Sequence, residues 1–147
     1  MRDLAESDKN EISVFDISTQ QKVTYYHKTI KTDDHLAFNS LTFKKAQETT
    51  NITEIQQAQI DFLLNYITGF EEDYFCINGK PISSDKDNKN YNPGWKGILR
   101  DAVGDQLLSI MEILFSKSNY ILKKNSPLMM NSKSGTMPGQ KKKGKNT

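Results

Sequence analysis

The chain opens with apolar residues at every second position and then changes to a helical spacing. Residues 12–17 alternate well enough for a β-strand. Residues 23–27, which follow a polar turn, are rich in the β-branched and aromatic side chains that favour strands. The two segments predict a β-hairpin. One face of its first strand would carry Ile12, Val14 and Asp16. Because two strands alone are marginal in water, the hairpin must pack on other elements.

Helical spacing begins after residue 32 and predicts helices at 33–47 and 53–68. The acidic pair at 33–34 suits the positive end of the first helix dipole. Either Asn51 or Thr53 is expected to cap the start of the second helix, and Asn51 with Glu54 has the spacing of a capping box. Gly69 follows its last apolar residues, in a position where glycine commonly ends a helix.

The second half of the domain has clear turn signals. Asn78-Gly79 predicts a tight turn after an apolar segment at 75–77. A polar loop at 83–92 leads to Asn92-Pro93, which favours the start of a third helix. A final helix is predicted at 105–116. Its apolar stripe comprises Leu107, Leu108, Met111, Leu114 and Phe115.

These elements predict an α+β fold in which the N-terminal hairpin packs on a small bundle of three to four helices. We expect one domain at 11–122, with a weak apolar segment at 120–122, between a disordered N-terminus at 1–10 and a disordered basic tail at 123–147. The predicted core comprises Phe62, Leu63, Ile67, Trp95, Leu99, Leu108 and Phe115.

Composition and charge refine this prediction. Only 35% of the 147 residues are hydrophobic, so the core is expected to be small. The formal net charge of +2 hides an acidic body and a basic tail. Eight lysines and no acid follow Glu112. Residues 1–112 therefore hold 12 bases and 18 acids, a net charge of −6. A basic tail can contact nucleic acid or an acidic protein surface, or it can be a solvated end.

Several classes of protein are excluded by simple absences in the sequence. No run of about 18 apolar residues predicts a membrane-spanning helix, and the polar N-terminus lacks the apolar core of a secretory signal. A soluble cytosolic protein is therefore expected. The single cysteine, Cys76, allows neither an internal disulfide nor a cysteine metal cluster. We expect it to be a half-buried small apolar residue.

Candidate catalytic motifs fail on inspection. His27 and His35 are the only histidines, and neither belongs to a nucleophile elbow or a zinc-hydrolase motif. Residues 85–90 resemble the start of a calcium loop, but the acceptor, glycine and glutamate that such a loop needs further on are missing. The sequence therefore predicts no enzyme activity, no cofactor and no metal site.

A resemblance to a known family rests on a series of short motifs. They are residues 63–70 (LLNYITGF), 73–75 (DYF), 78–85 (NGKPISSD), 91–99 (YNPGWKGIL), 105–108 (DQLL) and 114–115 (LF). Together they resemble the tail assembly chaperones of Mu-like and related long-tailed bacteriophages and prophages. The resemblance covers about residues 12–116, and it implies a small hairpin followed by helices and a disordered C-terminus.

The resemblance implies a non-enzymatic protein that binds the tape measure protein and helps to recruit tail tube subunits, with no small-molecule substrate and no membrane contact. Because a tape measure protein is long and helical, we expect a helix-in-groove contact with apolar side chains of the predicted helices. The candidate partner-binding residues are Phe62, Tyr66, Phe70, Met111 and Phe115.

Two alternatives stay open. One is a small virion structural protein, such as a tail-completion or connector component. The other is a nucleic-acid-binding protein that acts through the basic tail, although the acidic body and the core-like spacing of the aromatic residues argue against it.

Overall fold

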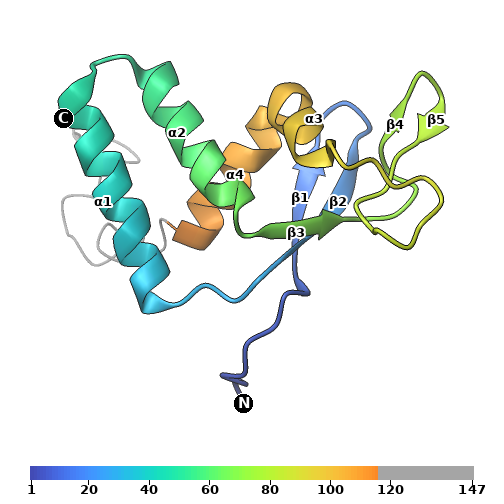
Figure 1. Ribbon diagram of the computed structural model, residues 1–147, viewed down its shortest axis with the longest axis horizontal. Helices are drawn as coiled ribbons and strands as arrows, with labels where there is room; N and C mark the ends of the chain where they lie inside the picture. The colour runs from blue at the N-terminus through green and yellow to red at the C-terminus, as the bar shows by residue number, and fades with distance from the viewer. Residues whose placement is uncertain (116–147) are drawn as a thin grey trace, which may run out of the picture. The chain divides into compact units, whose positions relative to one another are not determined.

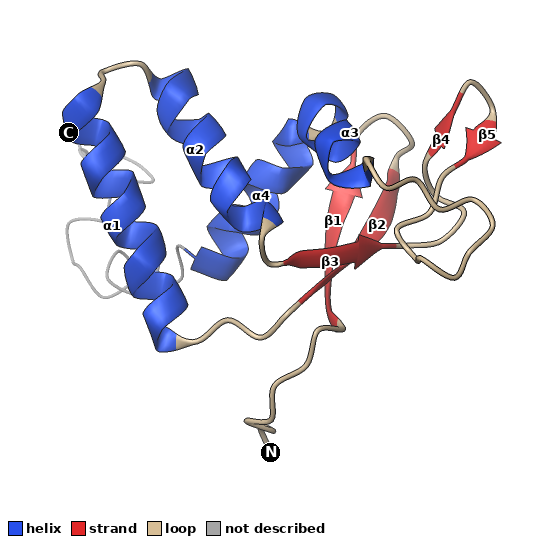
Figure 2. Ribbon diagram, in the orientation of Figure 1, coloured by secondary structure: helices blue, strands red, loops and turns tan. Residues whose placement is uncertain are grey.

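The fold is described for residues 1–115 from a computed structural model. Within these residues a three-stranded antiparallel sheet, in the order β1-β2-β3, packs against four helices (Figure 1), and the α+β class predicted from the sequence is confirmed. A separate two-stranded ribbon, β4-β5, lies beside them (Figure 2). The strands are β1 (Asn10–Asp16), β2 (Gln21–His27), β3 (Ile67–Phe70), β4 (Cys76–Ile77) and β5 (Lys80–Pro81). The helices are α1 (Thr32–Glu48), α2 (Ile52–Leu64), α3 (Trp95–Ala102) and α4 (Gly104–Phe115).

The predicted hairpin is confirmed as β1 and β2. The two strands pair without interruption from Asn10 opposite His27 to Asp16 opposite Gln21. The alternation of β1 has its expected consequence, because Ile12, Val14 and Asp16 are buried while the residues between them are exposed. The strands therefore bury one face of the hairpin.

The second predicted helix is too long, because it ends at Leu64 instead of continuing to residue 68. The next residues form β3, which pairs with β2 and places Phe70 opposite Tyr25. The β-branched Ile67 and the aromatic Phe70 are both buried in this strand. β2 would otherwise be left with an unpaired edge, so the gain from sheet pairing outweighs the helical spacing of these residues.

Local capping signals place the helix starts well. The Asp34 carboxylate accepts a hydrogen bond from the Lys31 N–H at 2.8 Å, before the first turn of α1. The Asn51 side chain accepts from the Thr53 N–H at 2.9 Å at the start of α2. The third helix starts later than Asn92-Pro93 predicts: α3 begins at Trp95 with Gly94 as its N-cap, and the Asn92 side chain accepts from the Gly94 N–H at 2.8 Å. Each cap satisfies a backbone donor close to its helix.

The Asn78-Gly79 turn is confirmed between β4 and β5. Both residues have positive φ, 52° and 78°, as a two-residue hairpin turn of type I′ requires. Cys76, which we expected to be half-buried, is exposed in β4. The reason is that this short ribbon lies outside the main sheet and buries neither of its strands.

The stripe predicted for α4 is partly wrong. Leu107, Ile110 and Phe115 are buried, whereas Leu108 and Met111 are only half-buried. Ile110 was not part of the predicted stripe. A helix in which most residues are apolar offers several stripes of similar quality, so only the position of the sheet decides which side faces the core.

Residues 1–9 contain no helix or strand, although they are joined to later segments. The Ser7 N–H donates to Thr29 Oγ1 at 2.8 Å, and Thr68 Oγ1 donates to the Asp8 carbonyl at 2.5 Å. The predicted segment at 120–122 and the predicted basic tail at 123–147 lie outside the described residues.

Candidate partner-binding surface

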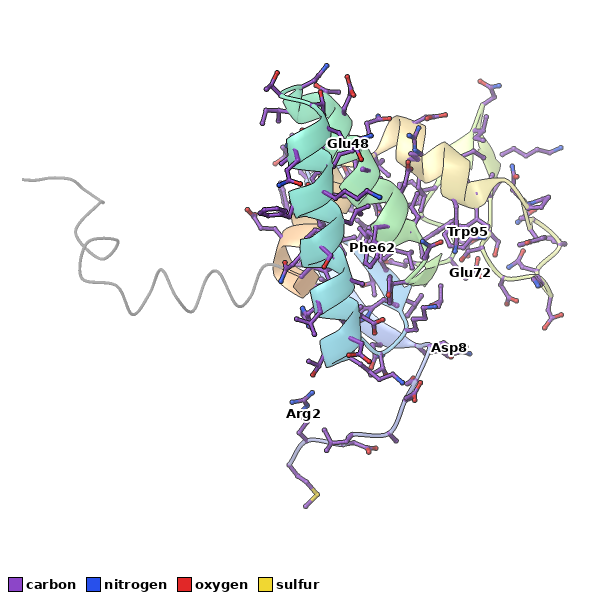
Figure 3. The ribbon with its side chains drawn as sticks, turned by 60° about the vertical axis from the view of Figure 1, so that its left-hand side comes forward. Arg2, Asp8, Glu48, Phe62, Glu72 and Trp95 are labelled. Carbon is purple, nitrogen blue, oxygen red and sulfur yellow. The ribbon has the colours of Figure 1, made fainter. Side chains whose placement is uncertain are left out.

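Helix α1 is exceptional for how little of it is buried. Among its 17 residues only Phe38 is fully buried. The helix packs on α2, and the Phe38 ring meets the edge of the Phe62 ring with centroids 5.7 Å apart. Figure 3 shows Phe62 between α1 and α2. This interface is therefore one row of aromatic side chains, which Tyr66 extends at 5.3 Å from Phe62.

Polar contacts join α1 to α2 at one point and to Tyr66, which follows α2, at another. Gln59 Nε2 donates to Thr42 Oγ1 at 3.0 Å near the middle of α1. At the start of α1, the Tyr66 hydroxyl donates to Asp34 Oδ1 at 2.6 Å. The Lys28 ammonium lies 4.9 Å from the centre of the Tyr66 ring. These contacts fix how α1 lies on α2.

The Tyr66–Asp34 bond also sets the charge state of both groups. Burial, together with the hydrogen bond to Asp34, raises the pKa of Tyr66 to about 12. Partial burial opposes the charged form of Asp34, but hydrogen bonds from Tyr66 and from the Lys31 N–H outweigh it and lower the pKa of that carboxyl. At neutral pH the pair is thus a neutral hydroxyl donating to a carboxylate.

The opposite side of α1 carries a second set of apolar side chains. Leu36 is 57% exposed and Phe43 is 65% exposed. They are seven residues apart, so they lie almost in line along the helix, and Phe38 lies about 200° around the axis from Leu36. The helix therefore has two apolar sides, of which α2 covers only one. Ile52, at the start of α2, is a further large apolar residue that is 64% exposed.

Charged residues gather over α2, between Lys45 on the inner side of α1 and Arg100 of α3. Arg100 Nε lies 2.5 Å from Asp61 Oδ1, and another of its guanidinium nitrogens donates to Gln57 at 2.7 Å. The bond to Asp61 raises the pKa of Arg100, which keeps the guanidinium charged. A shallow groove of about 360 Å³ lies here. It is lined by Lys45, Thr53, Glu54, Gln57, Ala58, Asp61 and Arg100.

The five candidate partner-binding residues do not form one accessible surface. Phe70 and Phe115 are each 1% exposed and are core side chains. Phe62, Tyr66 and Met111 are half-buried. The first two belong to the row between α1 and α2, so these aromatic side chains hold the helices and not an external partner in this structure.

Sequence reasoning missed Leu36, Phe43 and Ile52 as accessible residues. The signal for the first two was present in the irregular spacing of apolar positions in the first helix, at 36, 38, 41 and 43. Positions 36 and 43 share one side of a helix, whereas 38 points the other way. Two interleaved stripes explain this spacing better than one imperfect stripe.

One polar cleft is lined by side chains of both charges. It has a volume of about 660 Å³ and lies between β3 and the loop at 84–87. Its walls mix Asp8, Glu72, Asp85 and Asp87 with Lys9 and Lys86. Across residues 1–115, no group of three or more His, Cys, Asp or Glu side chains is placed to hold a metal ion.

The two histidines lie at element ends. His27 is half-buried at the end of β2, with Nδ1 2.9 Å from the Lys28 carbonyl oxygen. His35 is half-buried in the first turn of α1. Among the helices that the structure describes, none has the length and apolar content needed to cross a membrane.

Comparison with known proteins gave no match: no protein-family model, no curated protein and no solved structure resembles this chain.

Proposed function

We propose that this protein is a non-enzymatic assembly chaperone of long-tailed phage particles, which binds the tape measure protein and helps to recruit tail tube subunits. The observation that carries the proposal is the outward side of α1, where Leu36 and Phe43 are exposed on a helix that buries only Phe38. The motifs similar to those of tail assembly chaperones supply the class of partner. α1 supplies the surface.

The geometry of α1 suits a helical partner. Leu36 and Phe43 are spaced by two helical turns, and an amphipathic helix presents its apolar residues with the same period. A partner helix laid along α1 would cover both side chains. Binding would then be driven by burial of apolar area.

The partner is expected to leave the core of the chaperone unchanged. On the inner side of α1, the rings of Phe38, Phe62 and Tyr66 already pack on one another. The outer side is accessible without any rearrangement. Docking of this kind takes place on a preformed surface.

The test is binding of the full-length chain to the tape measure protein of the same tail-gene cluster, measured by co-expression, pull-down and calorimetry. The double variant Leu36→Ser/Phe43→Ser should weaken binding at least about 100-fold, because each buried side chain contributes about 1.5–3 kcal/mol. A control, Ile77→Ser/Ile113→Ser, removes two exposed apolar residues from β4 and α4 and should leave the affinity unchanged.

Unchanged binding by the α1 variant with an intact fold would contradict the proposed surface. Absence of any binding to the tape measure protein, or copurification of the protein with mature particles, would contradict the chaperone function. The second result would favour a virion structural protein instead.

A further inference from the structure

Strand β1 forms one edge of the main sheet (Figure 1). Its seven residues pair with β2 in continuous register, with no bulge between Asn10 and Asp16. The other edge of β1 has no neighbouring strand among the described residues. It is thus a straight and fairly long free edge.

The hydrogen bonds of β2 show which groups of β1 point outward. The Thr24 carbonyl accepts from the Glu71 N–H at 2.8 Å, so the backbone of Thr24 is directed toward the β3 side. Thr24 and its partner Ser13 are therefore a non-hydrogen-bonded pair of the β1–β2 ladder. The N–H and C=O of Ser13 consequently point to the free edge, and by alternation so do those of Glu11 and Phe15. None of these six groups has a hydrogen-bond partner within residues 1–115.

Proteins usually protect such an edge with lysine, proline, a bulge or a short strand, and β1 has none of these. Instead, Phe15 is 53% exposed on the edge strand, and Ile17 just beyond it is 70% exposed. We infer that two copies of this chain pair edge to edge through antiparallel β1 strands, about a two-fold axis at Ser13, to form a six-stranded sheet.

The sequence of β1 is self-complementary in this register. Ser13 meets Ser13 of the second copy, and Glu11 meets Phe15, so no like charges face each other. On the core side, Ile12 meets Val14, which continues the apolar face of each sheet. The three outward residues of each strand then exchange six N–H···O=C bonds.

Other registers are less favourable. With the axis at Ile12, Phe15 would pair with residue 9, and with the axis at Val14, Glu11 would pair with residue 17. Residues 9 and 17 both lie outside the strand. Pairing about Ser13 is therefore the register in which the three outward residues of β1 pair only with the outward residues of β1 in the second copy. A two-fold axis also makes the contact closed, because each partner uses the same edge.

The first test is the oligomeric state of the full-length protein, measured by sedimentation over a range of concentrations. The wild type should form a dimer whose fraction rises with concentration. Ser13→Pro removes an N–H that the β1–β2 ladder does not use, and it should weaken the dimer at least about tenfold. Ser13→Ala is the matched control, because it loses the hydroxyl contact with Thr24 but keeps the N–H, and its dimer should match the wild type.

A second pair of variants tests the register without threatening the fold. Phe15 faces Lys22 in its own hairpin and Glu11 in the second copy. Phe15→Glu should therefore stabilise the hairpin but weaken the dimer, whereas Phe15→Lys should do the reverse. The glutamate variant should have the higher melting temperature, and the lysine variant should have the higher dimer affinity. If one variant ranks higher in both measurements, the register is wrong.

Oxidative cross-linking gives an independent readout. In a Cys76→Ser background, Ser13→Cys should form a disulfide between copies, because the two Cα atoms of a hydrogen-bonded antiparallel pair lie about 5.5 Å apart. Glu11→Cys, equally exposed but far from its own counterpart, should not. A monomer at every concentration, or a dimer that Ser13→Pro leaves intact, would overturn the inference.

Discussion

Helix α1 and strand β3 use their residues in opposite ways. The four residues of β3 bury Ile67, Gly69 and Phe70, whereas the 17 residues of α1 bury only Phe38. The strand lies between other elements: β2 is on one side, and Ser84 contacts it from the other. Among the described residues, the helix packs mainly on α2. The length of a helix or strand is therefore a poor guide to how much it contributes to the core of this fold.

The two regions also differ in the shape of their aromatic contacts. Around Phe70 the rings form a cluster, with Phe75 at 5.1 Å and Trp95 at 5.8 Å, both edge to face. Around Phe62 they form a row between two helices. A cluster that joins a strand, a loop and a helix couples distant segments, while a row couples only α1 to α2. We expect changes in the cluster to unfold the domain and changes on α1 to act locally.

The largest expected effect is that of Phe70→Ala, which should lower the free energy of unfolding by about 3–5 kcal/mol through a cavity beside Trp95. Phe43→Ala is the matched control on α1 and should change it by less than about 0.5 kcal/mol, because Phe43 is exposed. Urea unfolding followed by circular dichroism and by Trp95 fluorescence measures both. Similar costs for the two variants would remove the distinction between the regions.

Gly69→Ala tests the tight packing of β3. A Cβ at Gly69 would lie 2.8 Å from Ser84 Oγ, and that oxygen accepts a hydrogen bond from the Phe70 N–H at 3.0 Å. We expect a loss of about 1–3 kcal/mol. In a Ser84→Ala background the same substitution should cost less, because the clash is gone. If the stability losses of Gly69→Ala and Ser84→Ala simply add in the double variant, the close approach of Gly69 to Ser84 Oγ does not limit stability.

Acid should weaken the hairpin end of the sheet. The buried Asp16 accepts from the Tyr74 hydroxyl at 2.7 Å and from the Ser18 N–H at 3.0 Å, and the Tyr74 bond lowers the pKa of this carboxyl more than its burial raises it. The resulting stability is fully present above the ordinary carboxyl pKa of about 3.9 and is lost as pH falls through the lower folded pKa.

Melting temperatures between pH 5 and pH 2 measure this effect. Tyr74→Phe should lower the melting temperature at neutral pH and also make its fall in acid shallower. An equally steep fall in this variant would assign the acid sensitivity to other carboxyls.

The smallest expected effect lies between α1 and α2. Thr42→Val keeps the side-chain shape but removes the hydroxyl that accepts from Gln59, and it should cost about 0.5–1 kcal/mol. Thr42→Ser, which keeps the hydroxyl, is the control. Hydrogen exchange should show faster opening of α1 in the valine variant without any change in β2. Faster exchange in β2 as well would mean that α1 and the sheet unfold together.

The sequence predicted most elements where the signals were local. The hairpin at β1–β2, the turn at Asn78-Gly79 and the cap at Asn51 each depend on groups within a few residues of one another or on a strict alternation. Such hydrogen bonds form in nearly the same way whatever the rest of the chain does. That is why their positions were correct to within one or two residues.

The candidate surface was less predictable. The aromatic residues selected from helical spacing include the buried Phe70 and the half-buried Phe62, whereas the exposed Leu36 and Phe43 were not among the selected residues. Spacing identifies the sides of a helix but does not say which side has a neighbour. An apolar residue has the same pattern whether it meets the core or a partner.

By itself the sequence determined the α+β class, the hairpin, the helix starts and the tight turn, because short-range hydrogen bonds and periodicity are written into neighbouring residues. Only the tertiary structure decided that Ile67–Phe70 is a strand, that Ile110 faces the core, and that α1 keeps one apolar side uncovered. Each of these depends on burial against residues far away in the chain. A side chain is buried only when a second segment packs against it, so the free energy of burial depends on both segments. The sequence of one segment alone does not show whether the other is present.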